Sequence, residues 1–306
     1  MSGKSRMRSQ MYKAPLFGGG IHSKRRNKLI SDILAFAIIT LLSSFVILPI
    51  YWVFRSSLIG SLDIFLWPPA FLPQGTIDPR EWLWSNYIIK PTTFNFFRYL
   101  FNSLTIVVPC VIFGTTTAVS CAYAFARLRF KGKRFLFSLC VGSMLLPATV
   151  TLIPLYIAWS NLGFADTYYP LILPFLCGGG AFNIFLLRQF IMTIPRELDE
   201  AAKIDGAGYF RTLTSIIVPS IKPAIIVIAL LIFIMTWNDL LQHMIYIHTK
   251  ESFTLVLGLT VFMGSFKADY AGMFAATILT IIPCLIIYLI GQRYFVEGIV
   301  MTGMKN

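Results

Sequence analysis

The stretch IPRELDEAAKIDGAGYFRTLTSIIVPSIKP, residues 194–223, is the one long polar insertion late in an otherwise apolar chain. Pro195 can open a helix, residues 197–204 are rich in helix formers, and the Asp-Gly-Ala-Gly run at 205–208 can end that helix. The pattern predicts a short surface helix, a turn and a second helix, placed between two apolar segments.

The apolar and charged residues of the first predicted helix fall on different faces. Leu198, Ala201 and Ala202 stand at i, i+3 and i+4 and form a narrow, shallow apolar stripe. Two pairs of opposite charge stand four residues apart and are expected to form ion pairs: Arg196 with Glu200, and Asp199 with Lys203. Two interpretations fit. The helix is either part of a solvated hairpin between membrane spans, or a surface on which another protein docks closely over the alanines.

The composition of the whole chain is that of a polytopic membrane protein. Hydrophobic residues make up 57% of the 306 residues, and the mean hydropathy is +0.73. Charged residues make up 13%, against roughly 25% in soluble domains. The net charge of +13 does not indicate nucleic acid, because no basic motif alternates with aromatic residues and most positive residues flank apolar runs.

Six apolar segments are long enough to cross a bilayer. They are residues 30–53, 101–125, 135–159, 168–187, 224–245 and 272–294. The first run exceeds the roughly 7 to 15 residues of a signal-peptide core, and no small-residue cleavage site follows it, so we expect a retained span. The apolar residues 253–263 are too few to span and are expected to form an outer interfacial or re-entrant piece.

The positive charges predict the orientation of these spans. Residues 1–29 are rich in Lys and Arg, lack acidic residues, and are expected to be a flexible basic tail ahead of a six-helix transmembrane domain at residues 30–306. With this tail inside, most of the 26 Lys and Arg residues fall in cytoplasmic segments, including the basic loop 126–134. The sequence therefore predicts an all-α membrane protein with both termini, and residues 194–223, on the cytoplasmic side.

Polar residues and glycines inside the predicted spans are candidates for a solute path. Asn183, Asn238 and Asp239 are the residues that such a path would use, since polar groups in spans face a bundle interior or a cavity. Asp239 has an alternative role at the membrane interface, where it would bond to loop backbone. The three glycines at 178–180 each cost about 1 kcal/mol of helix stability relative to Ala. Either the helix loosens there or another backbone comes very close.

The chain offers no catalytic or metal-binding constellation. Its five cysteines lie in apolar spans without C-x-x-C spacing and are expected to be packing residues. The three histidines have no carboxylate or thiol partner at metal-ligand spacing. No Walker A loop occurs, so ATP hydrolysis would require another protein. At the start of the second span, Asn102 and Ser103 are expected to bond to other helices.

The polar stretch resembles the EAA loop of ABC-importer permeases. The family pattern is E-A-A, x3, G, x9, I, x, L, P, and this chain departs from it only at Val218, where Leu is usual. The resemblance implies a coupling helix that sits in a cleft of a cytoplasmic ATPase and carries its closure to the membrane. The residues expected in this coupling role are Glu200, Ala201, Ala202, Asp205, Gly206, Ile216 and Pro219.

Other blocks resemble the carbohydrate-uptake subgroup of that family and are similar to the smaller membrane subunit of the maltose importer. They are residues 161–174, 181–190, 237–240 and 292–306. The resemblance implies a type I importer permease that works by alternating access in a bacterial or archaeal plasma membrane, in contact with lipid. It also implies three partners: a second related permease, an ATPase dimer that holds ATP and magnesium, and a sugar-binding protein outside.

The resemblance also implies that the cofactor and most sugar contacts belong to the partner subunits. The chain itself is expected to hold no cofactor and no nucleic acid. The family's sugar contacts lie mainly on the partner permease, so no sugar-binding residue is implied here. The C-terminal tail of this type of subunit extends into the ATPase dimer, and the residues expected to do so are Gly303, Met304, Lys305 and Asn306.

Alternatives to a sugar importer remain open. The same machinery could import a polyol, a sugar phosphate or a peptide, since solute choice lies largely in the binding protein. A membrane enzyme or channel would need catalytic pairs or a symmetric polar pore, and the predicted spans contain no such pair. A membrane anchor without transport is disfavoured only weakly, by the kinked and glycine-interrupted spans.

Overall fold

The computed structural model describes residues 20–88, 94–264 and 268–303, and the regular structure within them is helical. The chain divides into two compact units, Met1–Trp52 and Val53–Asn306. What is described of the first unit belongs to one long helix, α1 (Gly20–Ser57). The large apolar side chains at positions 29–50 of α1 are exposed, as expected of a helix that faces lipid.

Helix α1 begins well before the predicted span at residue 30. Residues 20–29 are helical, whereas the sequence predicted a flexible tail over residues 1–29. The physical reason is that Lys and Arg are good helix formers and extend a helix that the apolar run has already nucleated. Residues 1–19 of the predicted tail lie outside the described residues.

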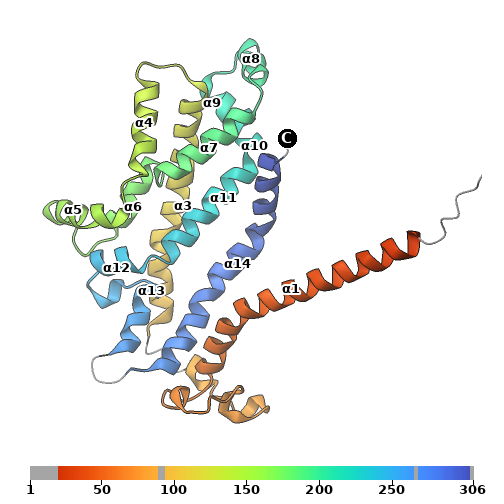
Figure 1. Ribbon diagram of the computed structural model, residues 1–306. Coiled ribbons are helices and arrows are strands. Elements are labelled where there is room, and N and C mark those ends of the chain that lie inside the picture. The colour runs from red at the N-terminus through yellow and green to blue at the C-terminus, as the bar shows by residue number, and fades with distance from the viewer. Residues whose placement is uncertain (1–19, 89–93, 265–267, 304–306) are drawn as a thin grey trace, which may run out of the picture. The chain divides into compact units, whose positions relative to one another are not determined.

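Four helices make the centre of the second unit, as Figure 1 shows. They are α3 (Phe96–Arg127), α7 (Ala181–Thr193), α11 (Lys222–Trp237) and α14 (Tyr270–Gly303). Helix α3 packs against α7 and α11, and α11 packs in turn against α14. The ends of α3 therefore lie where several elements of this unit meet.

The buried face of α3 explains how closely these helices pack. Small residues recur on that face at helical spacing, among them Cys110, Gly114, Ala118 and Ala122. Small side chains let helix backbones approach one another, which favours association between membrane helices. Larger apolar residues of α7 and α11, such as Leu187 and Ile228, fill the remaining space and are fully buried.

The third predicted span, residues 135–159, is not one helix. It is divided into α4 (Lys133–Ser143) and α5 (Ala148–Asn161), which are bent by 101° relative to each other. Pro147 lies at the break, and proline both disfavours helix in the residue before it and cannot donate to the preceding turn. The predicted apolar segment is therefore present as a bent pair of helices.

Two more predicted spans are interrupted. The three glycines at 178–180 separate α7 from α6 (Tyr169–Ile172) and from the 3-10 helix η4 (Leu173–Cys177). The fifth span ends at Trp237 rather than at residue 245, because a short separate helix, α12 (Leu240–Tyr246), begins after Asp239.

The number of spans agrees with the prediction when the bends are taken into account. Among the described residues, four helices are long and apolar enough to cross a membrane, and up to six if each of two bent pairs forms one span. The first pair is α4 with α5, and the second joins Tyr209–Ser220 to α11 at 83°. The prediction of six spans lies within this range.

The other described elements are short. They are η1 (Asp63–Phe65), η2 (Pro73–Gly75), η3 (Pro79–Glu81), η6 (Lys250–Ser252), α13 (Leu255–Gly258) and η7 (Leu259–Met263). Residues 253–263 thus form no spanning helix, as predicted. Asn102 Nδ2 donates to the carbonyls of Glu251 and Phe253, and Ser103 Oγ accepts from the Leu255 N–H. Both residues make the expected bonds to another segment.

Candidate functional site

The polar loop folds as predicted over its first helix, α8 (Glu197–Ile204). This helix ends in a Schellman motif, in which the Ala207 N–H donates to Ala202 O at 2.8 Å and the Gly206 N–H donates to Lys203 O at 3.1 Å. Gly206 has a φ of +76°, a left-handed conformation that glycine adopts without a Cβ penalty. A Cβ at Gly206 would meet nothing within 4 Å, so packing within the chain does not require a glycine here. The left-handed backbone at the end of the helix does.

Arg127, the last residue of α3, ties three elements together. Its Nε lies 3.1 Å from Asp199 Oδ2 on α8. Its Nη2 donates to the carbonyls of Ile191 and Ile194 at the end of α7, at 2.9 and 2.7 Å. The Arg127 side chain is 7% exposed and that of Asp199 is 22% exposed. Charges so far removed from water are costly to separate, so the ion pair fixes α8 to the ends of α3 and α7.

Neither ion pair expected within α8 forms among the described residues. Asp199 pairs with Arg127 and not with Lys203, while Arg196 and Glu200 are both exposed. An exposed ion pair at i, i+4 contributes little free energy to folding. Asp199 therefore pairs with Arg127, a partly buried cation on another helix. Glu200 and Asp205, both expected in the coupling role, face solvent.

The predicted apolar stripe is divided between two faces of α8. Ala202 is 6% exposed and packs inward, whereas Leu198 and Ala201 are exposed. The large apolar side chains that the loop leaves exposed are Leu198, Ile204, Tyr209 and Phe210. Such side chains on an otherwise polar loop indicate a surface that another molecule covers.

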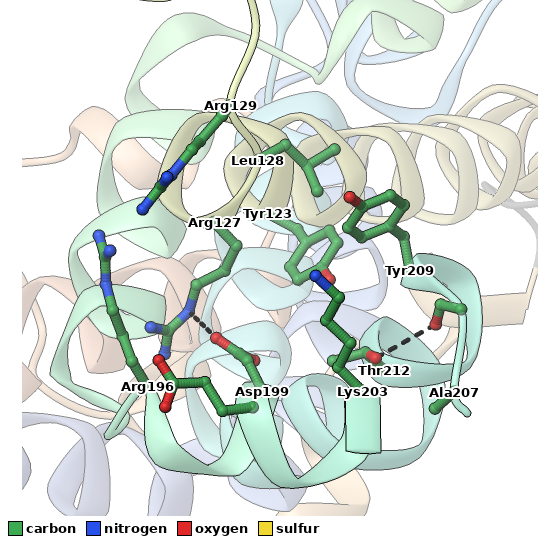
Figure 2. Close-up of a pocket in the computed structure, with 12 residues that line it drawn as sticks. Tyr123, Arg127, Leu128, Arg129, Arg196, Asp199, Lys203, Ala207, Tyr209 and Thr212 are labelled. Carbon is green, nitrogen blue, oxygen red and sulfur yellow. Dashed lines mark hydrogen bonds and ion pairs between the residues drawn. The ribbon is translucent and has the colours of Figure 1, made fainter. Parts of the chain in front are cut away.

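A cavity of about 450 Å³ lies between α8, the turn after it and the end of α3 (Figure 2). Four basic side chains line it together with two acidic ones: Arg127, Arg129, Arg196 and Lys203, with Asp199 and Glu200. Within the part of the chain that the structure describes, Asp199 Oδ1 is buried without a hydrogen-bond partner. The ion pair between Arg127 and Asp199 therefore lies in the wall of a mainly basic cavity.

The second half of the loop is not one regular helix. The single turn α9 (Tyr209–Thr212) continues into a π-helical turn, η5 (Leu213–Ile217), and then into α10 (Val218–Ser220). Pro219 supplies the reason, because it has no N–H to donate to the preceding turn. Ile216 is half-buried and Pro219 is exposed, and the chain then bends by 83° into α11. The second half of the loop, which includes Ile216 and Pro219, thus sets the direction in which the chain enters α11.

Asn183, expected to line a solute path, is buried beside the glycine break and bonds to it. It is 6% exposed, and its Nδ2 donates to Gly179 O at 2.7 Å. The glycines at 178–180 all have positive φ, so the helix is interrupted there. A Cβ added to Gly179 would stand 3.3 Å from the Gly114 Cα, so another backbone also comes close. Both effects expected of this glycine run occur together.

The other two expected path residues lie at the end of α11. Asn238 is exposed, and its Nδ2 donates to Ile234 O at 2.8 Å. Asp239 is half-buried and caps α12 by accepting from the Gln242 N–H at 3.0 Å. Asp239 also lines a cavity of about 120 Å³. It therefore makes the expected bond to backbone, and it also faces a cavity.

Sequence reasoning missed Arg127, the residue that attaches the polar loop to α3 and α7. The sequence identifies Arg127 only as one cation of the basic loop 126–134. A usable signal is a cation at the last residue of a helix, where helix carbonyls favour positive charge, together with acidic residues in a loop on the same side. At the other end of the chain, Gly303 is the last residue of α14, and residues 304–306 lie outside the described residues.

Comparison with known proteins places this architecture in a family. Residues 111–300 match the family described as binding-protein-dependent transport system inner membrane component. A diacetylchitobiose uptake system permease of Streptomyces coelicolor is 30% identical over 269 residues, which cover 87% of this chain and 86% of that protein. A trehalose transport system permease of Mycobacterium tuberculosis is 31% identical over 271 residues, covering 87% and 95%.

A solved structure shows the same fold. The crystal structure of a bacterial ABC transporter involved in the import of the acidic polysaccharide alginate matches with a TM-score of 0.73 and 24% identity, over 92% of this chain and all of that chain. Together with the family match, this fold identifies a multi-pass membrane protein. The chain belongs to the binding-protein-dependent transport system inner membrane components, the permease subunits of ABC transporters.

Proposed function

We propose that this chain is one of two permease subunits of an ATP-driven carbohydrate importer, and that α8 transmits the movement of a cytoplasmic ATPase to the spans. The observation that carries the proposal is the attachment of α8. Arg127 ties α8 to the ends of α3 and α7, while Leu198, Ile204 and the two aromatic residues after the turn are left exposed.

The loop is attached to the membrane helices in two places, and each would transmit a movement of α8. A partner that covers the exposed apolar residues would move α8 as a rigid piece, because the Schellman motif fixes its end. The ion pair would pass this movement to α3 and α7, and the bend after α10 would pass it to α11. Since α3 packs against both α7 and α11, the helices of the core would shift together, as alternating access requires.

Carbohydrate is the solute class that the relatives favour. They include proteins named for diacetylchitobiose, trehalose and arabinooligosaccharide transport, and a structural match named for alginate import. One relative, 36% identical over 206 residues, is named for the uptake of osmoprotective compounds. An osmoprotective compound is therefore the second candidate solute.

The proposal names the partners as well. A second related permease would complete the path, an ATPase dimer would bind ATP and magnesium, and an extracytoplasmic binding protein would deliver the sugar. A related alginate transporter structure is titled as a complex with a pentasaccharide-bound periplasmic protein. In this arrangement both termini and α8 lie in the cytoplasm, residues 303–306 contact the ATPase, and α1 and the outer helices contact lipid.

Affinity purification of the tagged chain from mild detergent, with mass spectrometry of the copurifying proteins, tests the assembly. Recovery of a second permease and an ATPase is expected. The complex is then placed in proteoliposomes with the binding protein encoded nearest to it, and uptake of labelled trehalose and diacetylchitobiose is measured with and without ATP. A chain that purifies alone in several mild detergents, or a complex whose ATPase ignores the loaded binding protein, would contradict the proposal.

A further inference from the structure

A second cavity lies at the junction of α11 and α12, and no coupling residue lines it. Its volume is about 120 Å³. It is lined by two residues of the α6 and η4 segment and by five residues around the end of α11: Leu171, Phe175, Met235, Thr236, Asp239, Gln242 and His243. Four of these seven side chains are polar, in a region where apolar residues prevail.

Thr236 is a lining residue whose hydroxyl group lacks a hydrogen-bond partner. Its side chain is 7% exposed, and within the described residues its Oγ1 is buried without a hydrogen-bond partner. The buried Thr280, by contrast, bonds to the carbonyl four residues earlier, Ala276 O, at 2.8 Å. Buried hydroxyls without a partner are rare, so a group that enters the cavity is the natural partner of this hydroxyl.

His243 and Asp239 bring further hydrogen-bonding atoms to the same space. His243 is 2% exposed, and its Nδ1 lies 3.0 Å from Thr254 Oγ1. That contact occupies one of its two ring nitrogens. Asp239 Oδ1 accepts from the Gln242 N–H, whereas an ionised carboxylate accepts about four hydrogen bonds. The cavity therefore joins a hydroxyl, an imidazole and a carboxylate that all have bonding capacity to spare.

The chemistry of the lining selects a class of ligand. The one carboxylate and the absence of Lys or Arg among the lining residues disfavour an anion. The described residues contain no group of three or more His, Cys, Asp or Glu residues that could hold a metal ion. Neighbouring hydroxyl groups, which donate and accept within a small volume, match the mixture of acceptor and donor side chains.

We propose that this cavity is a solute subsite, at which this subunit binds the hydroxyl groups of a carbohydrate during its passage. The inference rests on the proposed importer function. At about 30 Å³ per water in the liquid, the cavity has room for a few hydroxyl groups at one edge of a sugar and not for a whole oligosaccharide. Phe175 offers an aromatic surface beside those groups.

The variant Thr236→Val tests the subsite, because it removes the hydroxyl and keeps the shape. If Thr236 served structure alone, losing an unpartnered buried hydroxyl would leave stability unchanged or raised and would leave transport unchanged. If Thr236 binds solute, sugar taken up per ATP hydrolysed falls about fivefold, the factor that corresponds to one hydrogen bond. The measurement uses the complex in proteoliposomes, with labelled trehalose and diacetylchitobiose as probes.

Matched controls separate the subsite from general damage. Thr115→Val removes another buried hydroxyl without a partner, on α3 and away from this cavity, and should transport like the wild type. Asp239→Asn keeps the helix cap but removes the charge, whereas Asp78→Asn makes the same change at a cap outside the cavity, where Asp78 accepts from the Arg80 N–H. Asp239→Asn should lower the uptake ratio, and Asp78→Asn should not.

The outcomes distinguish this inference from the function on which it rests. If the wild-type complex imports either sugar and the Thr236 and Asp239 variants match it, the subsite is wrong and the importer stands. If the wild-type complex imports neither sugar, the carbohydrate function is wrong and the subsite falls with it. A lower uptake ratio in both variants, with both controls unchanged, establishes the subsite.

Discussion

The polar loop around α8 and the junction of α11 and α12 are both places where a helix stops, and they differ in what their buried polar side chains contact. At α8 the charged groups Arg127 and Asp199 turn inward and pair, while apolar side chains are left exposed. At the junction the hydroxyl of Thr236 and the ring of His243 are also buried, but they surround a cavity and form no ion pair with each other. The first arrangement suits contact with a protein surface, and the second suits contact with a polar solute.

The largest predicted effect is the loss of stability that follows from removing the Arg127 side chain. Arg127→Met keeps the length of the side chain but leaves Asp199 without its ion pair, and removes two hydrogen bonds to carbonyls of α7. Removing one partner of a fully buried pair costs about 3–5 kcal/mol. Because Asp199 is 22% exposed, we expect about 1–3 kcal/mol and a lower thermal midpoint of the purified complex.

The double variant Arg127→Met with Asp199→Leu is the matched control for that prediction. It removes both charges, so part of the lost stability should return, since no unpaired charge remains. Arg129→Met, which changes an exposed cation of the same cavity that has no ion pair among the described residues, should keep the wild-type midpoint. Equal loss in all three variants would show that the ion pair has no special role.

Substitutions at the turn after α8 test whether this surface contacts a partner protein. Gly206→Ala forces a Cβ into a left-handed conformation, which costs about 1 kcal/mol, whereas Gly208→Ala is made at a φ of −73° with open space around it. Gly206→Asp adds a charge at the exposed turn. It should leave the protein in the membrane and reduce the response of the ATPase to loaded binding protein at least tenfold, while Gly208→Ala responds normally.

A fully retained ATPase response in Gly206→Asp would remove the coupling role from this turn. A loss of membrane-inserted protein in the same variant would instead show that the turn is needed for folding. Comparing Gly206→Ala with Gly206→Asp separates the backbone strain, which both share, from the added charge.

The smallest expected effect concerns the chain that follows α12. Burial would raise the pKa of Asp166, but hydrogen bonds from Thr249 Oγ1 and from the backbone N–H groups of His248 and Thr249 outweigh it and hold the pKa below its ordinary value. A lowered carboxyl pKa stabilises the fold above the unfolded value of about 3.9, and this stabilisation is lost as the pH falls through the lowered pKa.

The hydrogen-exchange protection factors of residues 248–253, which correct the rates for the intrinsic pH dependence of amide exchange, should therefore stay constant near neutral pH and fall only in acid, below about pH 4. Asp166→Asn is the control, since asparagine tolerates the φ of 54° at this position but carries no titratable group. Its exchange should not show the acid step. An identical acid step in the variant would assign the pH dependence to another carboxyl group.

Local signals in the sequence predicted much of the structure of the polar loop around α8. The bounds of α8 and the position of its turn agree with the structure because helix formers, a stop at Gly206 and a Pro near the start act over a few residues. For the third span the apolar run predicted the segment, but its hydropathy did not predict the bend of 101° at Pro147. Apolar content measures the preference for lipid and does not report the direction of the axis.

The sequence by itself determined the membrane class, the six apolar segments and the family, because hydropathy and a motif of fixed spacing are properties of consecutive residues. Only the tertiary structure decided that Arg127 pairs with Asp199 and that Phe175, Thr236 and His243 share a cavity. These residues are far apart in the chain or on different turns. Their contacts depend on how α3, α7 and α11 pack, which no local pattern records.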